Sequence, residues 1–200
     1  IVNSDWSSDV CSSDLNVINA DEFKNRGSIL THDVIIDEIK KGNIVISEPF
    51  TFDNVGPASV DLTLGNEFRM FFDTPEPISL TPTVDYRSPD ITKLVYVKDG
   101  DYFELPPHTS CLGITKETVK LAPHICGLLE GRSRMARLGL LVHFTASLMA
   151  PGINNRQVLE ICNLSPRTLR LFPGVKVCQF VFMRADGEYT YEGSWQNQSL

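Results

Sequence analysis

The sequence predicts an all-β fold, a barrel or jelly roll with a few short helices. Runs rich in β-branched and aromatic residues recur from residue 44 to residue 183, a composition that favours strands. Turn signals made of Pro, Gly, Asn and Asp separate these runs, for example DNVGP, DTPEP, KDGD and FPGVK. Many short strands at this spacing are typical of antiparallel barrels and jelly rolls.

A helix is expected to open the domain. In SILTHDVIIDEIKKGNIVI, Thr31 or Asp33 can cap a helix and Gly42 can end it. Between these signals, apolar residues follow at roughly helical spacing, at Val34, Ile35 and Ile39.

The strand pattern begins directly after this helix. In order, the expected strands are IVI, SVDLTL, EFRMFF, KLVYV, YFEL, CLGI, ICGLL, VLEIC, TLRLF and VKVCQFVFM. The segment RSRMARLG interrupts the series, because it holds good helix formers and stops at Gly139. One or two helical turns are therefore expected between two strands.

The 200 residues are enough for one domain that buries about 70% of its unfolded surface. Residues 1–15, IVNSDWSSDVCSSDL, contain a near-repeat without periodicity, and we interpret them as a non-native artefact of sequencing-adapter read-through. Residues 16–27 are an extension of uncertain role. We expect the domain to span residues 28–200.

The charge balance argues against a nucleic-acid-binding protein. The chain carries 18 Lys and Arg against 25 Asp and Glu, for a formal net charge of -7, which weakens long-range attraction to nucleic acid. No apolar run approaches the roughly 20 residues of a membrane-spanning helix, and the N-terminus lacks the regions of a signal peptide. We therefore expect neither a nucleic-acid nor a membrane partner.

Cysteine usage indicates a reducing compartment. The five cysteines are odd in number and irregular in spacing, and Cys126, Cys162 and Cys178 lie in apolar runs, as buried free thiols would. We expect the cytoplasm. No zinc site is expected, because the spacings of His108, Cys111, His124 and Cys126 match no zinc-binding motif.

A basic segment stands out in this acidic chain. EGRSRMARLGL places Arg132, Arg134 and Arg137 close together, with a hydroxyl donor at Ser133. A glycine followed by the start of a short helix can offer N–H groups to an anion, so the segment is a candidate phosphate site. The alternative is a solvated helix face.

A carboxylate interrupts an apolar strand. Strand alternation places Val158, Glu160 and Cys162 on one face of the segment, with Leu159 and Ile161 on the other. A carboxylate in such surroundings is costly unless it is paired or used in chemistry. The alternative is a solvent-facing position at a sheet edge. For His143, in a similar apolar setting, we expect a packed core imidazole.

A series of motifs occurs in order from about Ser28 to Gln198. They are GPASVDLTLGNEF, EGRSRMARLGL, VHFTA, PG at 151–152, VLEICN, LFPGVKVCQFVF and YEGSWQNQ. Single pieces such as PG are uninformative, but the ordered set resembles the dCTP deaminases of the dUTPase-like superfamily. The resemblance implies a distorted β-barrel or jelly roll, assembled as a homotrimer with active sites between subunits.

The resemblance also implies the reaction and the residues that carry it. The reaction is the hydrolytic deamination of dCTP to dUTP and ammonia, metal-free at the reacting carbon, with Mg²⁺ carried on the triphosphate. Glu160 falls on the general base and proton shuttle. Ser133 and the carbonyl of Ala146 match groups that hold the water and the exocyclic amine. Arg137 matches an arginine that supports the carboxylate and the developing charge.

Further residues match substrate-binding positions by the same resemblance. The triphosphate cradle, contributed by the neighbouring subunit, matches Arg132, Ser133, Arg134, Met135, Ala136 and Arg137. The strand that reads the base edge matches Val158, Leu159 and Glu160. The tail that closes over the nucleotide matches Tyr191 and Gln198. His143 matches a position linked to feedback inhibition by dTTP. We interpret Asp61, in SVDLTLG, as a structural carboxylate that binds backbone N–H groups.

Several positions depart from the family pattern. Arg134 replaces a second serine and Ser194 replaces a tail lysine, so Arg134 is expected to supply the missing phosphate charge. Ala150 replaces an acidic residue, and Ile153 stands where an aromatic residue is frequent. In the related dUTPases, an aspartate at the position of Ala150 orients the attacking water. Deamination without efficient dUTP hydrolysis is therefore favoured. The alternatives are a dUTP diphosphatase or bifunctional enzyme, and a non-catalytic trimeric nucleotide-binding regulator.

Overall fold

Strands make up most of the regular structure. The computed structural model describes residues 28–193, 196, 198 and 200. Its elements, in chain order, are α2 (His32–Lys40), β1 (Ile44–Ile46), the 3-10 helix η1 (Phe52–Asn54), β2 (Val60–Phe71), β3 (Thr92–Tyr96), β4 (Phe103–Leu105), β5 (Ser110–Leu121), β6 (Ile125–Gly131), α3 (Ser133–Ala136), β7 (Leu140–Val142), β8 (Leu148–Met149), β9 (Asn154–Asn163), β10 (Leu169–Leu171) and β11 (Lys176–Arg184).

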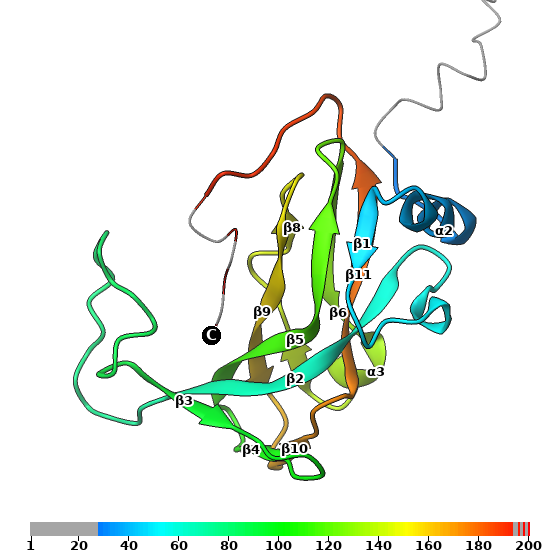
Figure 1. Ribbon diagram of the computed structural model, residues 1–200. Helices are drawn as coiled ribbons and strands as arrows, with labels where there is room; N and C mark the ends of the chain where they lie inside the picture. Colours follow the sequence, from blue (N-terminus) through cyan, green and yellow to red (C-terminus); the bar gives the residue numbers. More distant parts are fainter. Residues whose placement is uncertain (1–27, 194–195, 197, 199) are drawn as a thin grey trace, which may run out of the picture.

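One large antiparallel sheet curls into a distorted barrel (Figure 1). Within the described residues its strand order is β7-β9-β5-β2-β11-β6-β8, with β1 paired to β5 and β3 paired to β2. The short strands β4 and β10 pair with each other at one end. This architecture confirms the all-β prediction with a few short helices.

The sheet curls around an apolar core that β2, β5, β9 and β11 share. Alternate residues of β11 face inward, and Phe180 and Phe182 are fully buried with their rings stacked 4.6 Å apart. Burial of one such side chain contributes about 1.5–3 kcal/mol to stability. The core fixes the register of β9, the strand that carries the candidate catalytic carboxylate.

Two predicted strands prove to be one. SVDLTL and EFRMFF form the single strand β2. Gly65 lies at an irregularity in the pairing of β2 with β5, and the strand continues through it. A Cβ at Gly65 would lie 2.7 Å from the Ile114 carbonyl oxygen, so the close approach of two strands requires glycine there. The run CLGI likewise extends to Leu121, and β7 and β8 were not predicted.

The opening helix forms as predicted. Thr31 is its N-cap, although its side chain makes no capping hydrogen bond, and Gly42 follows the helix with a φ of 77°. The apolar stripe buries Ile35 against the barrel. The second predicted helix is α3, a single turn between β6 and β7.

The described chain begins on the barrel. The Leu30 N–H donates to the Phe182 carbonyl oxygen at 2.9 Å, and Ile29 forms a bridge with Met183. The predicted artefact at 1–15 and the extension at 16–27 lie outside the described residues. No helix in the described part of the chain has both the length and the apolar character needed to cross a bilayer.

Candidate active site

A pocket of about 350 Å³ opens beside β9 and holds several of the predicted residues. Its described lining consists of Tyr86, His143, Ala146, Leu148, Met149, Ala150, Ile153, Asn155, Gln157, Val158, Glu160, Tyr191 and Gln198. Residues from the middle of the chain and from its C-terminal end therefore line the same pocket. A concave site that combines apolar side chains with a few polar groups is typical of small-molecule binding.

Glu160 projects toward this pocket because β9 alternates as the sequence predicted. Leu159 and Ile161 are buried in the core, at 0% and 1% exposure, whereas Val158 and Glu160 are only partly buried. β9 pairs with β5 on one side, where Leu112 lies opposite Glu160, and with β7 on the other side, next to Glu160. Glu160 is thus neither a core residue nor a fully solvated edge residue.

His143 contacts both predicted catalytic groups of this pocket. Its Nε2 donates to the Ala146 carbonyl oxygen at 3.0 Å, and its Nδ1 lies 3.4 Å from Glu160 Oε2. Its own N–H donates to the Glu160 carbonyl oxygen at 2.7 Å. His143 is buried, at 4% exposure, as expected for a packed imidazole, but its ring lies at the pocket. The link to dTTP stays a prediction.

Two buried polar atoms of this pair have no hydrogen-bond partner among the described residues. They are His143 Nδ1 and Glu160 Oε2, which face each other at a distance beyond good hydrogen-bond geometry for nitrogen and oxygen. Buried polar groups are usually satisfied, and exceptions concentrate where water or a ligand binds. The Glu160 carboxylate is therefore placed to take a further partner in the pocket.

Two described residues near the C-terminal end, Tyr191 and Gln198, lie at the pocket. The Tyr191 N–H donates to the Pro151 carbonyl oxygen at 3.0 Å, and Gln198 Nε2 donates to the Arg156 carbonyl oxygen at 2.7 Å. Both side chains line the pocket. Ser194 lies outside the described residues, so the predicted exchange of charge with Arg134 stays a prediction.

The basic turn, residues 132–137, does not line the pocket of its own chain. Arg132 caps α3 and Arg137 follows it, while Met135 is partly buried and Ser133, Arg134, Ala136 and Arg137 are exposed. The structure of one chain therefore places Glu160, Ala146, Val158, Tyr191 and Gln198 together, and it leaves the basic turn on a separate surface.

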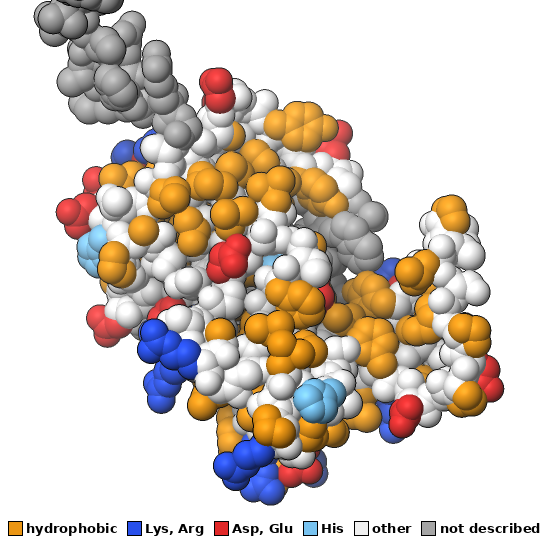
Figure 2. Space-filling view, turned by 180° about the vertical axis from the view of Figure 1, so that it is seen from behind, with side chains coloured by type: hydrophobic (Ala, Val, Ile, Leu, Met, Phe, Trp, Pro, Cys, Tyr) orange, Lys and Arg blue, Asp and Glu red, His pale blue; other side chains and the backbone are white. Residues whose placement is uncertain are grey.

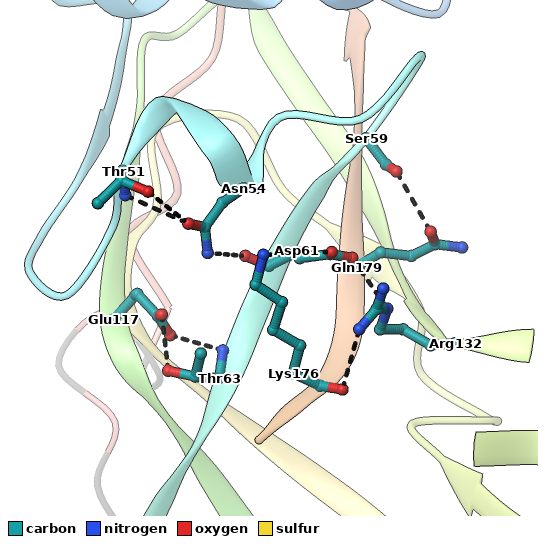
Figure 3. Close-up of polar contacts among 9 residues, drawn as sticks. All are labelled: Thr51, Asn54, Ser59, Asp61, Thr63, Glu117, Arg132, Lys176 and Gln179. Atoms are coloured by element: carbon teal, nitrogen blue, oxygen red, sulfur yellow. Dashed lines mark hydrogen bonds and ion pairs between the residues drawn. The ribbon is translucent and has the colours of Figure 1, made fainter. Parts of the chain in front are cut away.

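Arg132 is held by a polar cluster, drawn in Figure 3. Asp61 Oδ1 lies 3.0 Å from Arg132 Nε, and Lys176 Nζ lies 3.7 Å from Asp61 Oδ2. Arg132 Nη1 also donates to the Lys176 carbonyl oxygen at 3.3 Å. The prediction for Asp61 was wrong in its partners: the carboxylate binds the cationic side chains of Arg132, the N-cap residue of α3, and of Lys176 on β11, the strand paired with β2.

The neighbouring Glu117 does bind a backbone N–H. It is fully buried and accepts hydrogen bonds from the Thr63 N–H at 2.9 Å and from its hydroxyl at 2.7 Å. Sequence reasoning did not single out Glu117, because its strand extension beyond CLGI was not expected.

Outside the basic turn, one further predicted substrate-binding side chain does not reach the pocket. Leu159 is fully buried in the core, so only its backbone could meet a ligand. Conversely, Asn155, Gln157 and Tyr86 line the pocket and were not predicted. Asn155 and Gln157 carry a weak signal, as polar residues in a strand, but Tyr86 lies in a Pro-rich loop without any periodicity.

The described residues that line this pocket include no cysteine. Cys111, Cys126, Cys162 and Cys178 are free, and burial raises the pKa of Cys111 to about 12. Among the described residues, no three His, Cys, Asp or Glu side chains are grouped to hold a metal ion.

Fold and site together define a β-barrel protein whose pocket contains a partly buried carboxylate and an imidazole. The model of the family described as dCTP deaminase-like matches residues 29–185. The chain belongs to this dCTP deaminase-like family.

Relatives from archaea and bacteria carry related names. Proteins named dCTP deaminase, dUMP-forming, are 36% identical over 162 residues in Methanopyrus kandleri and 37% identical over 164 residues in Pseudarthrobacter chlorophenolicus. The matches cover 78% and 80% of this chain, and 82% and 84% of the relatives. A Thermomicrobium roseum protein named dCTP deaminase is 37% identical over 159 residues, 77% of this chain and 78% of its own.

A solved structure shares the fold. The crystal structure of 2'-deoxycytidine 5'-triphosphate deaminase from Agrobacterium tumefaciens matches with a TM-score of 0.61 and 20% identity. The match covers 80% of this chain and 49% of that chain, so this chain spans about half the length of the solved one.

Proposed function

We propose that the protein deaminates dCTP by hydrolysis, with Glu160 as the general base. The observation that carries this proposal is the Glu160 carboxylate in the pocket wall, with Oε2 buried and without a hydrogen-bond partner among the described residues. Membership of the dCTP deaminase-like family and the names of the relatives supply the substrate.

The reaction consumes one water and releases one ammonia. Glu160 takes a proton from water while the water oxygen bonds to C4 of the cytosine ring, and the proton passes to the ring nitrogen N3. Transfer of the second proton, from the new C4 hydroxyl to the exocyclic amine, lets the C4–N bond break as the C4 carbonyl forms, which gives dUTP and ammonia. The Ala146 carbonyl oxygen already accepts from His143, and its second lone pair can hold the water or the amine.

We further propose that a second copy of the chain completes the site within a homotrimer. Ser133 and Arg137 are exposed on the basic turn, outside the pocket of their own chain. Large apolar side chains are exposed beside both regions, with Leu138 at 61%, Phe144 at 52% and Leu148 at 67%. Figure 2 shows hydrophobic side chains gathered over one face of the molecule. Such surfaces often mark subunit interfaces.

In this arrangement the neighbouring subunit's basic turn would bind the triphosphate. Guanidinium groups suit phosphate because they donate paired hydrogen bonds and stay charged. Magnesium would arrive on the triphosphate and screen its charge. It takes no part in the step at the cytosine ring.

We propose dUTP as the product. Ala150 lines the pocket with a methyl group, which cannot orient a water against the phosphate chain. The second candidate is release of dUMP, which the names of the Methanopyrus and Pseudarthrobacter relatives favour. A third candidate, nucleotide binding without turnover, is weaker because Ser133, Arg137 and Glu160 are all present.

One assay separates the three candidates. The protein is incubated with dCTP and magnesium, and ammonia, dUTP, dUMP and pyrophosphate are resolved over time. We expect ammonia and dUTP in equal amounts. Ammonia with matching dUMP and pyrophosphate would support the bifunctional enzyme, and binding of dCTP without ammonia would support the regulator.

A further inference from the structure

The segment between β2 and β3, residues 72–91, forms an arm that projects from the barrel at the left of Figure 1. This arm brings Tyr86 into the wall of the pocket that contains Glu160. The proposed chemistry gives Tyr86 no role, and no motif in the sequence points to it.

The backbone of Tyr86 is tied to the hairpin at the base of the arm. The buried Thr92 hydroxyl donates to the Tyr86 carbonyl oxygen and accepts from Arg69 Nη1 at 3.1 Å. Phe72 and Ile91 close the base of the arm through a hydrogen bond of 3.1 Å. Tyr86 is therefore fixed relative to β2 and β3, although most of the arm around it is exposed.

The ring of Tyr86 lies near two cations. The guanidinium carbons of Arg69 and Arg87 lie 5.9 and 5.8 Å from its centroid, within the range of cation–π attraction. Arg87 is in turn held by Asp85, with Nη2 2.7 Å from Oδ2. Burial raises the pKa of Tyr86, so its phenol is neutral at physiological pH.

We propose that Tyr86 is a substrate-binding residue whose ring packs against the nucleoside part of dCTP. An aromatic face suits the flat, weakly polar surface of a base or a deoxyribose. Of the two guanidinium groups beside the ring, Arg87 is paired with Asp85, so Arg69 supplies the positive charge that favours an anionic nucleotide near this wall. The inference rests on the proposed function, because it takes dCTP as the ligand of this pocket.

A contact of this kind strengthens ground-state and transition-state binding alike, so its loss should raise KM more than it lowers kcat. For Tyr86→Ala we expect the KM and Kd for dCTP to rise at least about fivefold, the lower range for loss of one base–aromatic contact. Tyr86→Phe keeps the ring and is expected to bind dCTP more tightly than the alanine variant. Tyr96→Ala, on β3 of the same hairpin but outside this pocket and 65% exposed, is the matched control.

The measurements are steady-state kinetics with dCTP, calorimetric Kd values for dCTP and circular dichroism of every variant. A rise in KM and Kd for Tyr86→Ala, with Tyr96→Ala unchanged, supports the inference. Unchanged affinity, or a loss confined to kcat, overturns it. If the alanine variant does not fold, Tyr86→Leu replaces it and is judged by the same outcomes.

The kinetic and equilibrium data also keep the two proposals apart. A wild-type protein that releases no ammonia contradicts the proposed deamination. The Kd values for dCTP then still decide whether Tyr86 belongs to the binding site.

Discussion

At the residue scale, the pocket depends on a few polar side chains held by specific contacts. His143 donates to the Ala146 carbonyl oxygen and faces the Glu160 carboxylate at 3.4 Å, and its backbone has a φ of 53°, a region that few non-glycine residues adopt. This conformation turns the imidazole into the pocket instead of the core. The ring therefore positions the two groups to which we assign the chemistry.

We predict that His143→Asn lowers kcat for dCTP deamination by about 100-fold, because small displacements of catalytic groups have effects of this size. Asparagine tolerates positive φ, so the backbone should be preserved. The check is ammonia release, with the melting temperature as a control for folding. A folded variant with wild-type kcat would show that the imidazole does not position Glu160.

Asp61 has a comparable role for the basic turn, since it holds Arg132 beside Lys176. We predict that Asp61→Asn raises the KM for dCTP about tenfold with a smaller change in kcat, because Arg132 loses the charged partner that orients it. The exposed residue Asp53, substituted by Asn, is the matched control. Equal kinetics for both variants would remove Asp61 from the site.

At the element scale, α2 is joined to the barrel through one buried carboxylate. Glu38 is 2% exposed, and it accepts hydrogen bonds from Asn43, Lys41 and Arg184 at 2.6, 3.0 and 3.0 Å. Burial alone would raise the pKa of Glu38, but these donors together lower it from 4.5 to about 2. The ionised carboxylate is thus the form that stabilises the fold.

We predict that Glu38→Gln reduces the free energy of unfolding at pH 7 by about 3 kcal/mol, because it leaves buried donors with a weaker partner. This corresponds to a fall in Tm of roughly 6 to 12 °C for a domain of this size. The depressed pKa means that the difference from wild type is fully present above pH 4.5 and shrinks as the pH falls toward 2.

Thermal unfolding of both proteins between pH 7 and pH 3 measures this difference. The exposed residue Asp37 on the same helix, substituted by Asn, should leave Tm within about 1 °C, as surface changes usually do. A difference between Glu38→Gln and wild type that stays constant down to pH 3 would contradict the assigned pKa.

Elements with a clear pattern could be predicted from the sequence, and elements defined by contacts could not. The alternation around Glu160 and the start of the helix after Thr31 are local signals, and both were confirmed. The continuity of β2 through Gly65 depends on the neighbouring strand. The position of Tyr86 at the pocket depends on tertiary contacts of the arm. Neither feature leaves a periodic trace in the sequence.

At the scale of the whole molecule, the separation of the pocket from the basic turn leads to a prediction about assembly. If neighbouring subunits of a closed trimer share each site, then Glu160→Gln and Arg137→Ala are inactive alone but complement each other when co-assembled. Random mixing leaves about a quarter of the sites with both native groups, since each site takes its two groups from adjacent chains.

Co-expression of the two variants, followed by assay of the purified mixture, tests this arrangement. We expect about a quarter of wild-type ammonia release per chain. A mixture as inactive as either variant would show that both groups act within one subunit. Light scattering of the wild-type protein gives the number of chains independently.

The central claim is that the Glu160 carboxylate activates water against the cytosine ring. The most direct measurement is ammonia release from dCTP by Glu160→Gln, with Glu104→Gln as the control at an exposed ion pair. We predict a loss of at least about 10³-fold for the first variant, within the range for a removed general base, while dCTP binding persists. Ammonia release at the wild-type rate by Glu160→Gln would contradict the account.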